Sequence, residues 1–358
     1  MAQFHKLKIR DIYKETEDCS VIDFEIPQEL QSEFAFRQGQ HLTLKTTING
    51  EDVRRSYSLC SGPTDNIWKV AVKQIFEGKF STFANSVLKK GDFLDVMAPV
   101  GEFGVPIEAN KEKDYVAFVA GSGITPVLSM IKAHLALEPK SKFRLFYLNK
   151  TAKSIIFKEE IEAIRNIYLG RFEVFYFLDE EHRTIELLNG RFTPEKLKEL
   201  DEKIVDFSEI DECFICGPEP MIFLIRDELM KLGLAKEKIH YELFVSGLSE
   251  EAKQRAAAAL KRRAKNGTDV TILDGGKEFH FTMAEEYDNI LDAALAAGAD
   301  LPFACKGGVC STCKCKLLEG DVEMKVNYAL EEDEVKKDFI LSCQAVPTSK
   351  KVVVDFDV

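Results

Sequence analysis

The segment Ala304-Cys305-Lys306-Gly307-Gly308-Val309-Cys310-Ser311-Thr312-Cys313 decides the fold of the C-terminal part of the chain. Cys305, Cys310 and Cys313 are spaced as C-x4-C-x2-C, and Cys343 follows after twenty-nine further residues. This is the plant-type spacing of a [2Fe–2S] ligand set. The adjacent glycines in the segment would let the loop curl so that backbone amides point at the cluster sulfurs. We therefore predict four metal ligands: Cys305, Cys310, Cys313 and Cys343.

Two alternatives to this ligand set stay open. Zinc is the first, although zinc ribbons and fingers usually pair their ligands on both sides of the site, and the single distant Cys343 fits that arrangement poorly. The second is Cys315, which follows the loop closely and could replace one of the four ligands. Our interpretation is that Cys315 is a small buried thiol with a packing role.

The charge of the chain disfavours some classes of function. The 358 residues carry a net charge of −12, which disfavours nucleic-acid binding because that requires a basic surface. Residues 268–358 hold eighteen Asp and Glu against nine Lys and Arg, so they contribute −9 of this charge. The acidic surface serves either solubility or the docking of a partner, and both interpretations stay open.

The sequence indicates a cytoplasmic protein without a membrane segment. Met1–Lys6 contains no apolar stretch of a secretory signal, and the longest uncharged stretch, Tyr115–Ile131, is too short and too rich in turn residues to span a bilayer. We expect the nine cysteines to form no disulfides in that compartment.

The N-terminal hundred residues predict a small antiparallel β-barrel. Short alternating or β-branched stretches are separated by turns, and Asn49-Gly50 is typical of a two-residue hairpin. Many strands at this spacing favour a barrel. We place this domain at residues 1–107.

The pattern changes near Asn110 to alternating strands and helices. Tyr115–Ala120 is a continuous apolar run of the kind found in a buried parallel strand, and a glycine turn and a helix follow it. Further strand and helix pairs predict an α/β domain with a parallel sheet, which we place at residues 108–245. An Ala/Lys/Glu-rich linker, helical or partly helical, occupies residues 246–267, and the ferredoxin-like domain occupies 268–358.

Four short motifs occur in a fixed order along the first two domains. They are Arg55-Ser56-Tyr57-Ser58, Gly78-Lys79-Phe80-Ser81-Thr82, Gly121-Ser122-Gly123-Ile124-Thr125-Pro126 and Cys216-Gly217-Pro218-Glu219-Pro220-Met221. The second and third open helices, whose N-terminal amides suit phosphate groups. Each motif alone could be an ordinary turn. Together, in this order, they favour flavin and nucleotide binding.

In this order the motifs resemble those of the ferredoxin–NADP⁺ reductase superfamily. With the fused plant-type ferredoxin, which implies an α+β β-grasp fold, the chain resembles the reductase components of multicomponent oxygenases. Within these it is most similar to the reductases of phenylacetyl-CoA epoxidase (ring-1,2-epoxidase) systems. The narrower match lies in the cysteine segment and in Asn327-Tyr328, Leu341–Ala345 and Val353–Asp357, and that subfamily also has a cysteine at the place of Cys315.

The resemblance implies roles for individual residues. The expected catalytic residues are Tyr57 against the isoalloxazine, Ser58 near flavin N5, Cys216 beside nicotinamide C4, and the acidic Glu242. The resemblance implies that FAD is bound by Arg55, Ser56, Tyr57, Ser58, Val72, Lys73, Gly78, Ser81 and Thr82. It implies that the nicotinamide dinucleotide is bound by Gly121, Gly123, Thr125, Asn149, Lys150, Cys216, Gly217, Pro218 and Met221.

The resemblance also implies the function. Electrons would pass from NADPH to FAD, to the [2Fe–2S] cluster and to a di-iron oxygenase, either phenylacetyl-CoA epoxidase or the oxygenase of another aromatic or steroid system. The family usually has arginine where this chain has Lys150, so the expected preference for NADPH rests on a lysine. Two other classes are an enzyme acting on its own substrate and a sensor that keeps the cluster as a structural element. The scattered histidines disfavour the first, and the flavin and nucleotide motifs disfavour the second.

Overall fold

The computed structural model describes residues 3–244, 250–262 and 267–357. The chain forms two compact units. One unit comprises 5–53 and 57–244, and the other comprises 245–358 with residues 1–4 and 54–56. The predicted barrel and α/β domain together form most of the first unit.

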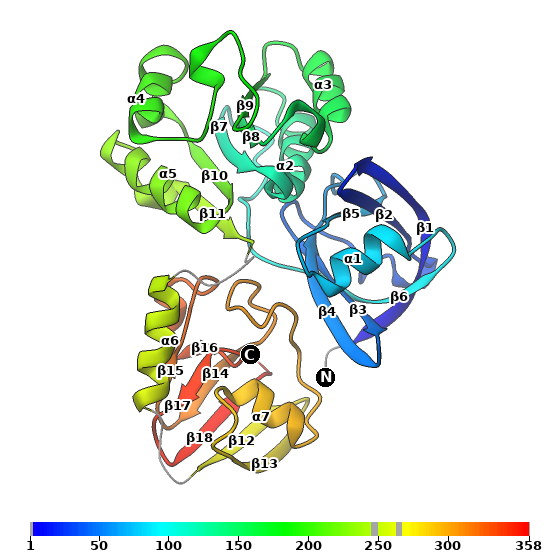
Figure 1. Cartoon of the computed structure of the whole chain (residues 1–358), viewed down its shortest axis with the longest axis vertical. Helices are drawn as coiled ribbons and strands as arrows, with labels where there is room; N and C mark the ends of the chain where they lie inside the picture. Colours follow the sequence, from blue (N-terminus) through cyan, green and yellow to red (C-terminus); the bar gives the residue numbers. More distant parts are fainter. Residues whose placement is uncertain (1–2, 245–249, 263–266, 358) are drawn as a thin grey trace. The chain divides into compact units, whose positions relative to one another are not determined.

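The barrel domain is a six-stranded sheet with the order β4-β3-β6-β1-β2-β5. Neighbouring strands are antiparallel wherever their register is resolved. A short helix, α1, packs against β2, β3 and β5 (Figure 1). The elements are β1 Phe4–Thr16, β2 Cys19–Glu25, β3 His41–Ile48, β4 Glu51–Ser58, β5 Trp68–Lys73, α1 Lys79–Ser86 and β6 Phe93–Val100. The predicted turn is confirmed, since Asn49 and Gly50 both have positive φ, at 54° and 83°.

The barrel encloses an apolar core. Leu42, Leu44, Val70 and Val72 are buried in it, because alternate residues of β3 and β5 point inward. Trp68, the single tryptophan of the chain, also lies in this core. Its indole Nε1 donates a 2.7 Å hydrogen bond to the carbonyl of Phe34, so the buried polar tip has a partner.

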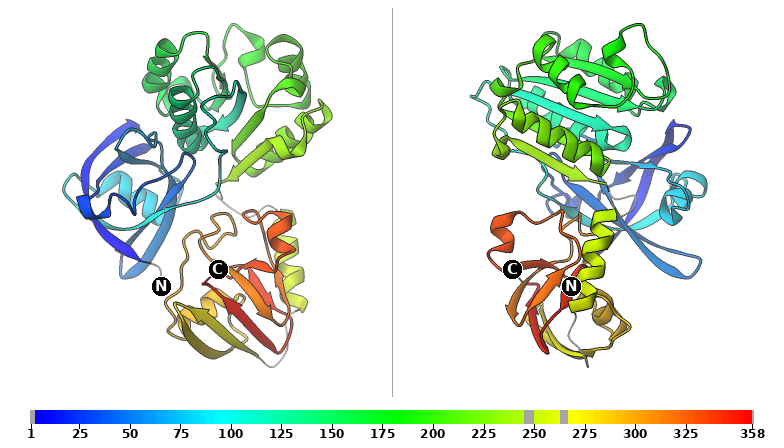
Figure 2. Two further views of the ribbon diagram at one scale, coloured as in Figure 1. Left: turned by 180° about the vertical axis from the view of Figure 1, so that it is seen from behind. Right: turned by 60° about the vertical axis from the view of Figure 1, so that its left-hand side comes forward.

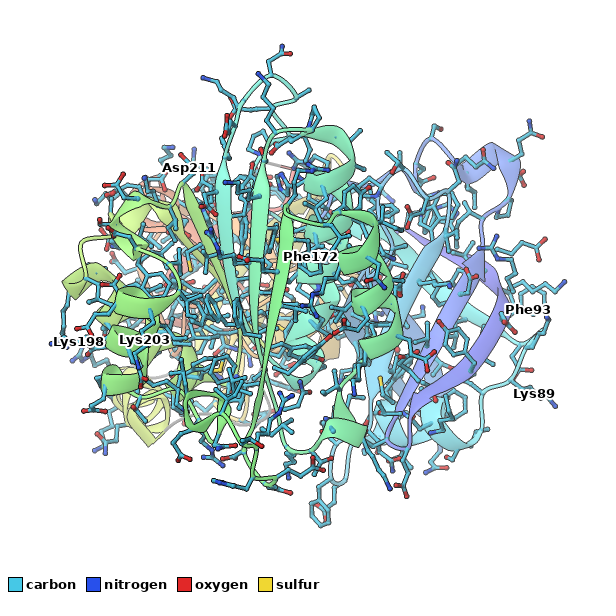
Figure 3. All side chains as sticks on the ribbon, turned by 90° about the horizontal axis from the view of Figure 1, so that it is seen from above. Lys89, Phe93, Phe172, Lys198, Lys203 and Asp211 are labelled. Carbon is cyan, nitrogen blue, oxygen red and sulfur yellow. The ribbon has the colours of Figure 1, made fainter. Side chains whose placement is uncertain are left out.

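The α/β domain is a five-stranded parallel sheet with the order β11-β10-β7-β8-β9. Figure 3 shows these strands between helices on both sides, with Lys198 and Lys203 of α4 on the outside. Strand order reverses at β7 and β10, the position where ligands bind in open α/β sheets. The elements are β7 Asp114–Ala120, α2 Ile124–Leu137, β8 Lys142–Asn149, α3 Lys158–Ile167, β9 Phe172–Leu178, α4 Pro194–Lys203, β10 Glu212–Gly217, α5 Glu219–Lys231 and β11 Ile239–Leu243.

The second unit contains a five-stranded sheet with the order β13-β12-β18-β14-β16 and a small sheet of β15 and β17. Strands β12 and β18 are parallel, and the other resolved pairs are antiparallel. Helix α7 packs against β13 and β17 (Figure 2). The elements are α6 Glu250–Arg262, β12 Thr268–Asp274, β13 Lys277–Met283, α7 Ile290–Ala296, β14 Lys314–Glu319, β15 Val322–Met324, α8 Glu332–Val335, β16 Phe339–Leu341, β17 Ala345–Pro347 and β18 Lys351–Asp355. This mixed sheet crossed by a helix is the predicted α+β domain.

Helix α6 lies in the part of the sequence predicted as a linker. Residues 245–249 and 263–266 of that stretch lie outside the described residues. The helix packs against β15, where Ala259 is fully buried and Arg262 Nη1 lies 3.1 Å from Glu323 Oε1. The described part of the stretch is therefore a helix attached to the second unit.

Candidate functional site

The four cysteines of the predicted cluster lie together in two pairs. The thiols of Cys305 and Cys310 are hydrogen-bonded to each other, and so are the thiols of Cys313 and Cys343. The hydrogen bond from Cys310 lowers the pKa of Cys305 to about 6, and the hydrogen bond from Cys313 lowers the pKa of Cys343. Two thiol pairs suit a group with two irons, each held by two protein ligands, so the residues fit a [2Fe–2S] cluster.

The loop that carries these cysteines is shaped by left-handed backbone at Lys306, Gly308 and Ser311, whose φ values are 53°, 77° and 50°. The backbone N–H of Gly307 donates to the sulfur of Cys305 at 3.2 Å, as expected for amides that face a cluster. Of the two predicted glycines, only Gly308 has positive φ. Lys306 and Ser311, both non-glycine residues, provide the other tight bends, which the glycine pattern did not predict.

Cys315 belongs to neither thiol pair and lies on β14 opposite Ile340 of β16. Its side chain is fully buried in the apolar core of the unit, and this burial raises the pKa of the thiol. A buried thiol outside both pairs favours packing over ligation, and the structural role of Cys315 stays a prediction.

Ser58 and Glu242 meet at the predicted flavin site although 184 residues separate them. The Ser58 hydroxyl donates to Glu242 Oε2 at 3.2 Å. Glu242 on β11 pairs in register with Cys216 on the parallel strand β10. Three of the four predicted catalytic residues therefore lie at one place, at the carboxyl end of β10.

The electrostatics of this place are unusual for a carboxylate. Burial raises the pKa of Glu242 to about 7, and the hydrogen bond from Ser58 opposes the rise. Burial also raises the pKa of the Cys216 thiol, with a smaller contribution from the Glu242 charge. The carboxyl group of Glu242 can therefore accept or donate a hydrogen bond near neutral pH, whereas Cys216 remains a thiol.

Tyr57, the fourth predicted catalytic residue, lies on β4 next to Ser58. Its half-buried ring lies 5.4 Å from the ring of Phe80 on α1, measured between centroids. Arg55, two residues earlier, is exposed, and its guanidinium donates to the Arg54 carbonyl at 2.7 Å. Ser56 lies between them and is half-buried. Tyr57 and Ser58 are consecutive residues at the end of β4, and their contacts with a flavin stay a prediction.

The predicted phosphate position lies at the start of α1. Gly78 precedes the helix, and a Cβ there would overlap Ser81 Oγ. The Ser81 hydroxyl accepts from Ile75 N and donates to the Gly78 carbonyl, each at 3.2 Å, while Thr82 is exposed. The loop therefore packs tightly on Ser81, and a phosphate contact through Thr82 and the helix amides remains a prediction.

The glycine turn before α2 packs directly on β10. A Cβ at Gly123 would overlap the Cys216 carbonyl oxygen, so no larger residue fits there. Thr125 is buried and donates to the Ser122 carbonyl at 3.0 Å. The Lys73 ammonium lies 3.8 Å from the position of a Cβ at Gly121, which places a positive charge beside the turn. Val72, its neighbour on β5, is buried in the barrel core.

The other end of the predicted nucleotide site lies after β8. Asn149 is buried beside the Tyr147 hydroxyl, and neither amide atom has a hydrogen-bond partner of good geometry among the described residues. The side chain of Lys150 is 72% exposed, with its Nζ 3.3 Å from Glu180 Oε1. An unpaired buried amide is costly, so Asn149 fits a residue that pairs with a ligand.

The residues after Cys216 complete the turn into α5. A Cβ at Gly217 would lie 2.6 Å from Met221 Cε and 3.2 Å from Ala120 Cβ. Pro218 caps the helix. The motif therefore holds β10 and β7 close together at the site.

Three protein-family models match the chain, one in each of its three predicted domains. Residues 6–104 match the model described as "Oxidoreductase FAD-binding domain", 118–227 match "Oxidoreductase NAD-binding domain" and 272–348 match "2Fe-2S iron-sulfur cluster binding domain". The chain is 41% identical to a component of the 1,2-phenylacetyl-CoA epoxidase of Escherichia coli, over 100% of this chain and 99% of the relative. The chain belongs to the ferredoxin–NADP⁺ reductase superfamily, in the branch fused to a plant-type ferredoxin.

Further relatives of this reductase align with it over nearly their whole length. It is 33% identical to the ferredoxin reductase component of 3-ketosteroid-9-alpha-monooxygenase from Rhodococcus rhodochrous, over 98% of this chain and 96% of the relative. The crystal structure of phthalate dioxygenase reductase shares the fold, with a TM-score of 0.59 and 24% identity over 99% of this chain and 98% of that one. No described helix of the reductase is long and apolar enough to cross a membrane.

Several polar residues that support the sites of the reductase were not predicted from the sequence. The buried Gln344 donates to the Lys306 carbonyl at 2.9 Å, and Ser342 Oγ donates to the Cys313 carbonyl at 3.0 Å. The Tyr147 hydroxyl donates to the Gly121 carbonyl at 2.9 Å and so holds the glycine turn. The position of Tyr147 within an apolar strand could have predicted such a contact, because a buried tyrosine hydroxyl usually has a hydrogen-bond partner.

A cavity near Lys150 was also missed. It lies beside the end of β9, has a volume of about 180 Å³, and is lined in part by Lys158, Tyr176, Glu181 and Arg183. These two cations add to Lys150 at the carboxyl edge of the sheet. The spacing of Lys158 from Lys150, eight residues, was not singled out as a signal.

Proposed function

We propose that this protein is an NADPH-dependent electron-transfer reductase that passes electrons through FAD and a [2Fe–2S] cluster to a di-iron oxygenase component. The observation that carries the proposal is the convergence of Ser58, Cys216 and Glu242 in one unit and of the two cysteine pairs in the other. When bound, the flavin supplies the exchange between a two-electron hydride and one-electron carriers.

The residues of the chain would bind, orient and shield these groups. Gly123 lets the turn pack against the Cys216 carbonyl so that the amides at the start of α2 would face a dinucleotide, and Lys73 offers a positive charge to its pyrophosphate. Cys216 would lie against the nicotinamide as a neutral thiol. Ser58 would donate toward the flavin or toward Glu242, depending on the protonation of that carboxyl group.

We propose phenylacetyl-CoA epoxidase as the acceptor system. The E. coli relative is named as a component of that epoxidase and aligns end to end at 41% identity. The second candidate is the reductase of another aromatic or steroid oxygenase, which the 33% identity to the 3-ketosteroid monooxygenase component favours. The higher identity and even coverage of the first relative favour the epoxidase.

Three finer points belong to the same proposal. NADPH is the preferred donor, because the exposed Lys150 would bind its 2′-phosphate, with Lys158 and Arg183 in the cavity nearby and Glu180 and Glu181 opposing them. The protein acts in the cytoplasm. The domains span 1–107, 108–245 and 268–358, with residues 246–267 connecting the last two.

The test begins with the composition of the purified protein. We expect one FAD, two irons and two labile sulfides per chain, with NADPH oxidation coupled to cytochrome c reduction. Four irons, or zinc in place of iron, would contradict the cluster. Reconstitution with candidate oxygenase components should then give NADPH consumption that depends on phenylacetyl-CoA, and consumption that depends on a steroid or another aromatic substrate instead would select the second candidate.

A further inference from the structure

Strand β4, which ends at Ser58, and the glycine turn before α2 each continue into a segment that contacts the other domain. Residues 59–65 follow directly after Ser58, and α2 follows directly after the glycine turn. Ser129 on α2 is fully buried, and its hydroxyl donates to the Ser61 carbonyl at 2.7 Å. A Cβ at Gly62 would lie 3.2 Å from Lys132 Cβ, so the loop packs directly on the helix.

Lys132 stands at the centre of this contact. Its Nζ lies 2.6 Å from Glu160 Oε1 on α3, 3.6 Å from Asp65 Oδ2 and 3.3 Å from the Cys60 carbonyl oxygen. The side chain is only 17% exposed. One ammonium group therefore joins two helices of the nucleotide domain to a loop of the barrel, in a position largely shielded from water.

A second contact joins the same domains at the start of α3. Glu15 on β1 accepts a 2.9 Å hydrogen bond from the backbone N–H of Phe157, whose φ is 60°. This contact fixes the N-terminus of α3, which also carries Glu160. The barrel is thus held to the nucleotide domain at α2 and at α3.

We propose that Lys132 and Ser129 are positioning residues that fix the separation between the flavin and nicotinamide binding sites. Cys60 and Ser61 lie two and three residues after Ser58, and Ser129 lies six residues after Gly123, which contacts Cys216. A displacement of α2 would therefore move Ser58, which ends β4. It would also move Cys216, which contacts the glycine turn at the start of α2. The inference rests on the proposed hydride transfer between the two sites, and nothing in the family comparison assigns it.

The expected effect follows from the sensitivity of hydride transfer to geometry, since a misplacement of about 1 Å can lower a rate by about a hundredfold. In Lys132→Met the limiting rate of flavin reduction at saturating NADPH, followed by stopped-flow absorbance, should fall by about tenfold or more. Ser129→Ala should lower it in the same direction. Lys132→Arg, which keeps the charge, should restore most of the rate.

A readout besides turnover separates positioning from folding and from affinity. The change in flavin absorbance on saturation with NADP⁺ should shrink in Lys132→Met, because it depends on how the nicotinamide lies against the flavin. The Kd for NADP⁺ should change by less than about threefold, since the groups that bind the dinucleotide are untouched. FAD content and thermal midpoint serve as checks that each variant is folded.

Lys198→Met is the matched control. Lys198 lies on the outer face of α4, with its Nζ 3.9 Å from Glu202, and contacts neither site (Figure 3). Folded Lys132→Met and Ser129→Ala proteins with the rate and absorbance change of the wild type would overturn the proposal. If Lys132→Met does not fold, the same result from Ser129→Ala alone decides against it. Wild-type protein whose flavin is reduced by neither NADPH nor NADH would instead refute the proposed function.

Discussion

Cys343 and Cys315 are the two candidates for the fourth ligand, and their surroundings differ. Cys343 shares a hydrogen bond with Cys313 that lowers its pKa, whereas burial raises the pKa of Cys315 on β14. Cys343 also lies near Cys305 of the other thiol pair, whereas Cys315 belongs to neither pair. The position of Cys343 in a thiol pair therefore favours it over Cys315, and the ligand set stays a prediction.

The first prediction concerns these two thiols. Cys343→Ser should lose the visible absorbance of the cluster, because a harder oxygen ligand suits iron–sulfur chemistry poorly. Flavin reduction by NADPH should remain fast, while cytochrome c reduction falls to background. Cys315→Ser should keep both steps and lose only packing energy. A cluster that survives in Cys343→Ser and disappears in Cys315→Ser would mean that the fourth ligand is Cys315.

Glu242 leads to a prediction about pH. Its pKa of about 7 lies above the usual 4.5, so the folded protein holds an extra proton between these values. Stability from this group is therefore gained as the pH falls through about 7 and is lost as it rises. When the pH is lowered from about 8 to about 5, the unfolding free energy of the wild type should rise relative to that of Glu242→Gln by on the order of 2 kcal/mol. The rise is measured as a higher thermal midpoint of the wild type. Parallel pH dependences in the two proteins would assign the carboxyl group an ordinary pKa.

Lys150 leads to a prediction about nucleotide preference. Lys150→Ala should raise the KM for NADPH by about tenfold and leave that for NADH nearly unchanged, since a charge-assisted contact to phosphate is worth roughly 1.5–3 kcal/mol. Glu180 Oε1 lies 3.3 Å from Lys150 Nζ and would repel the same phosphate. Glu180→Gln should therefore lower the KM for NADPH. Equal effects of Lys150→Ala on both dinucleotides would show that the lysine is only a solvated surface charge.

At the scale of elements, the glycine turn between β7 and α2 leads to the next prediction. Gly123→Ala places a methyl group against the Cys216 carbonyl oxygen, which forces the turn away from β10. The KM for NADPH should rise by at least about tenfold, and FAD content should stay unchanged. Gly190→Ala is the control, because a Cβ there meets no atom within 4 Å, so the variant adds only the strain of a side chain on left-handed backbone at φ 71°. Kinetics like those of the control would mean that the turn adapts.

Elements with a strong local pattern could be predicted, and those defined by their neighbours could not. The apolar run of β7, the helix α2 and the Asn49-Gly50 turn follow directly from periodicity and turn chemistry. Strand β6 was not assigned, and neither was β11, although Ile-His-Tyr-Glu-Leu alternates between apolar and polar residues over its five positions. Helix α4 was missed despite Thr193 and Pro194 at its start, which are ordinary N-terminal signals.

The site residues divide in the same way, into those that a local pattern predicts and those that depend on contacts between distant elements. The cysteine spacing is local chemistry, so the ligand set could be proposed from the sequence alone. The contact between Ser58 and Glu242 joins β4 to β11, and no local pattern predicts a pairing over that distance; only the resemblance to a family suggested it. The contacts of Lys132 depend on three elements packed together and were not anticipated.

At the scale of the whole molecule, the uneven charge leads to a prediction about acceptors. The C-terminal domain carries −9 of the net −12, so a basic acceptor such as cytochrome c should be attracted to it. The rate of cytochrome c reduction should fall several-fold between about 0.05 M and about 0.5 M salt, because exposed charges are screened. Ferricyanide, a small anion, is the control and should show no such fall. A flat response with cytochrome c would leave solubility as the role of the acidic surface.

The single tryptophan of the chain gives the barrel its own optical signal. Trp68 is buried in the barrel core and tied to Phe34, and the ferredoxin domain contains no tryptophan at all. Its ultraviolet emission overlaps the absorption of oxidised flavin, so a bound FAD would quench it by resonance energy transfer. Emission should rise when the flavin is stripped and fall again as it is restored, which gives a titration of flavin occupancy that needs no electron acceptor. Loss of the cluster would be followed separately, by the iron and labile sulfide that are released.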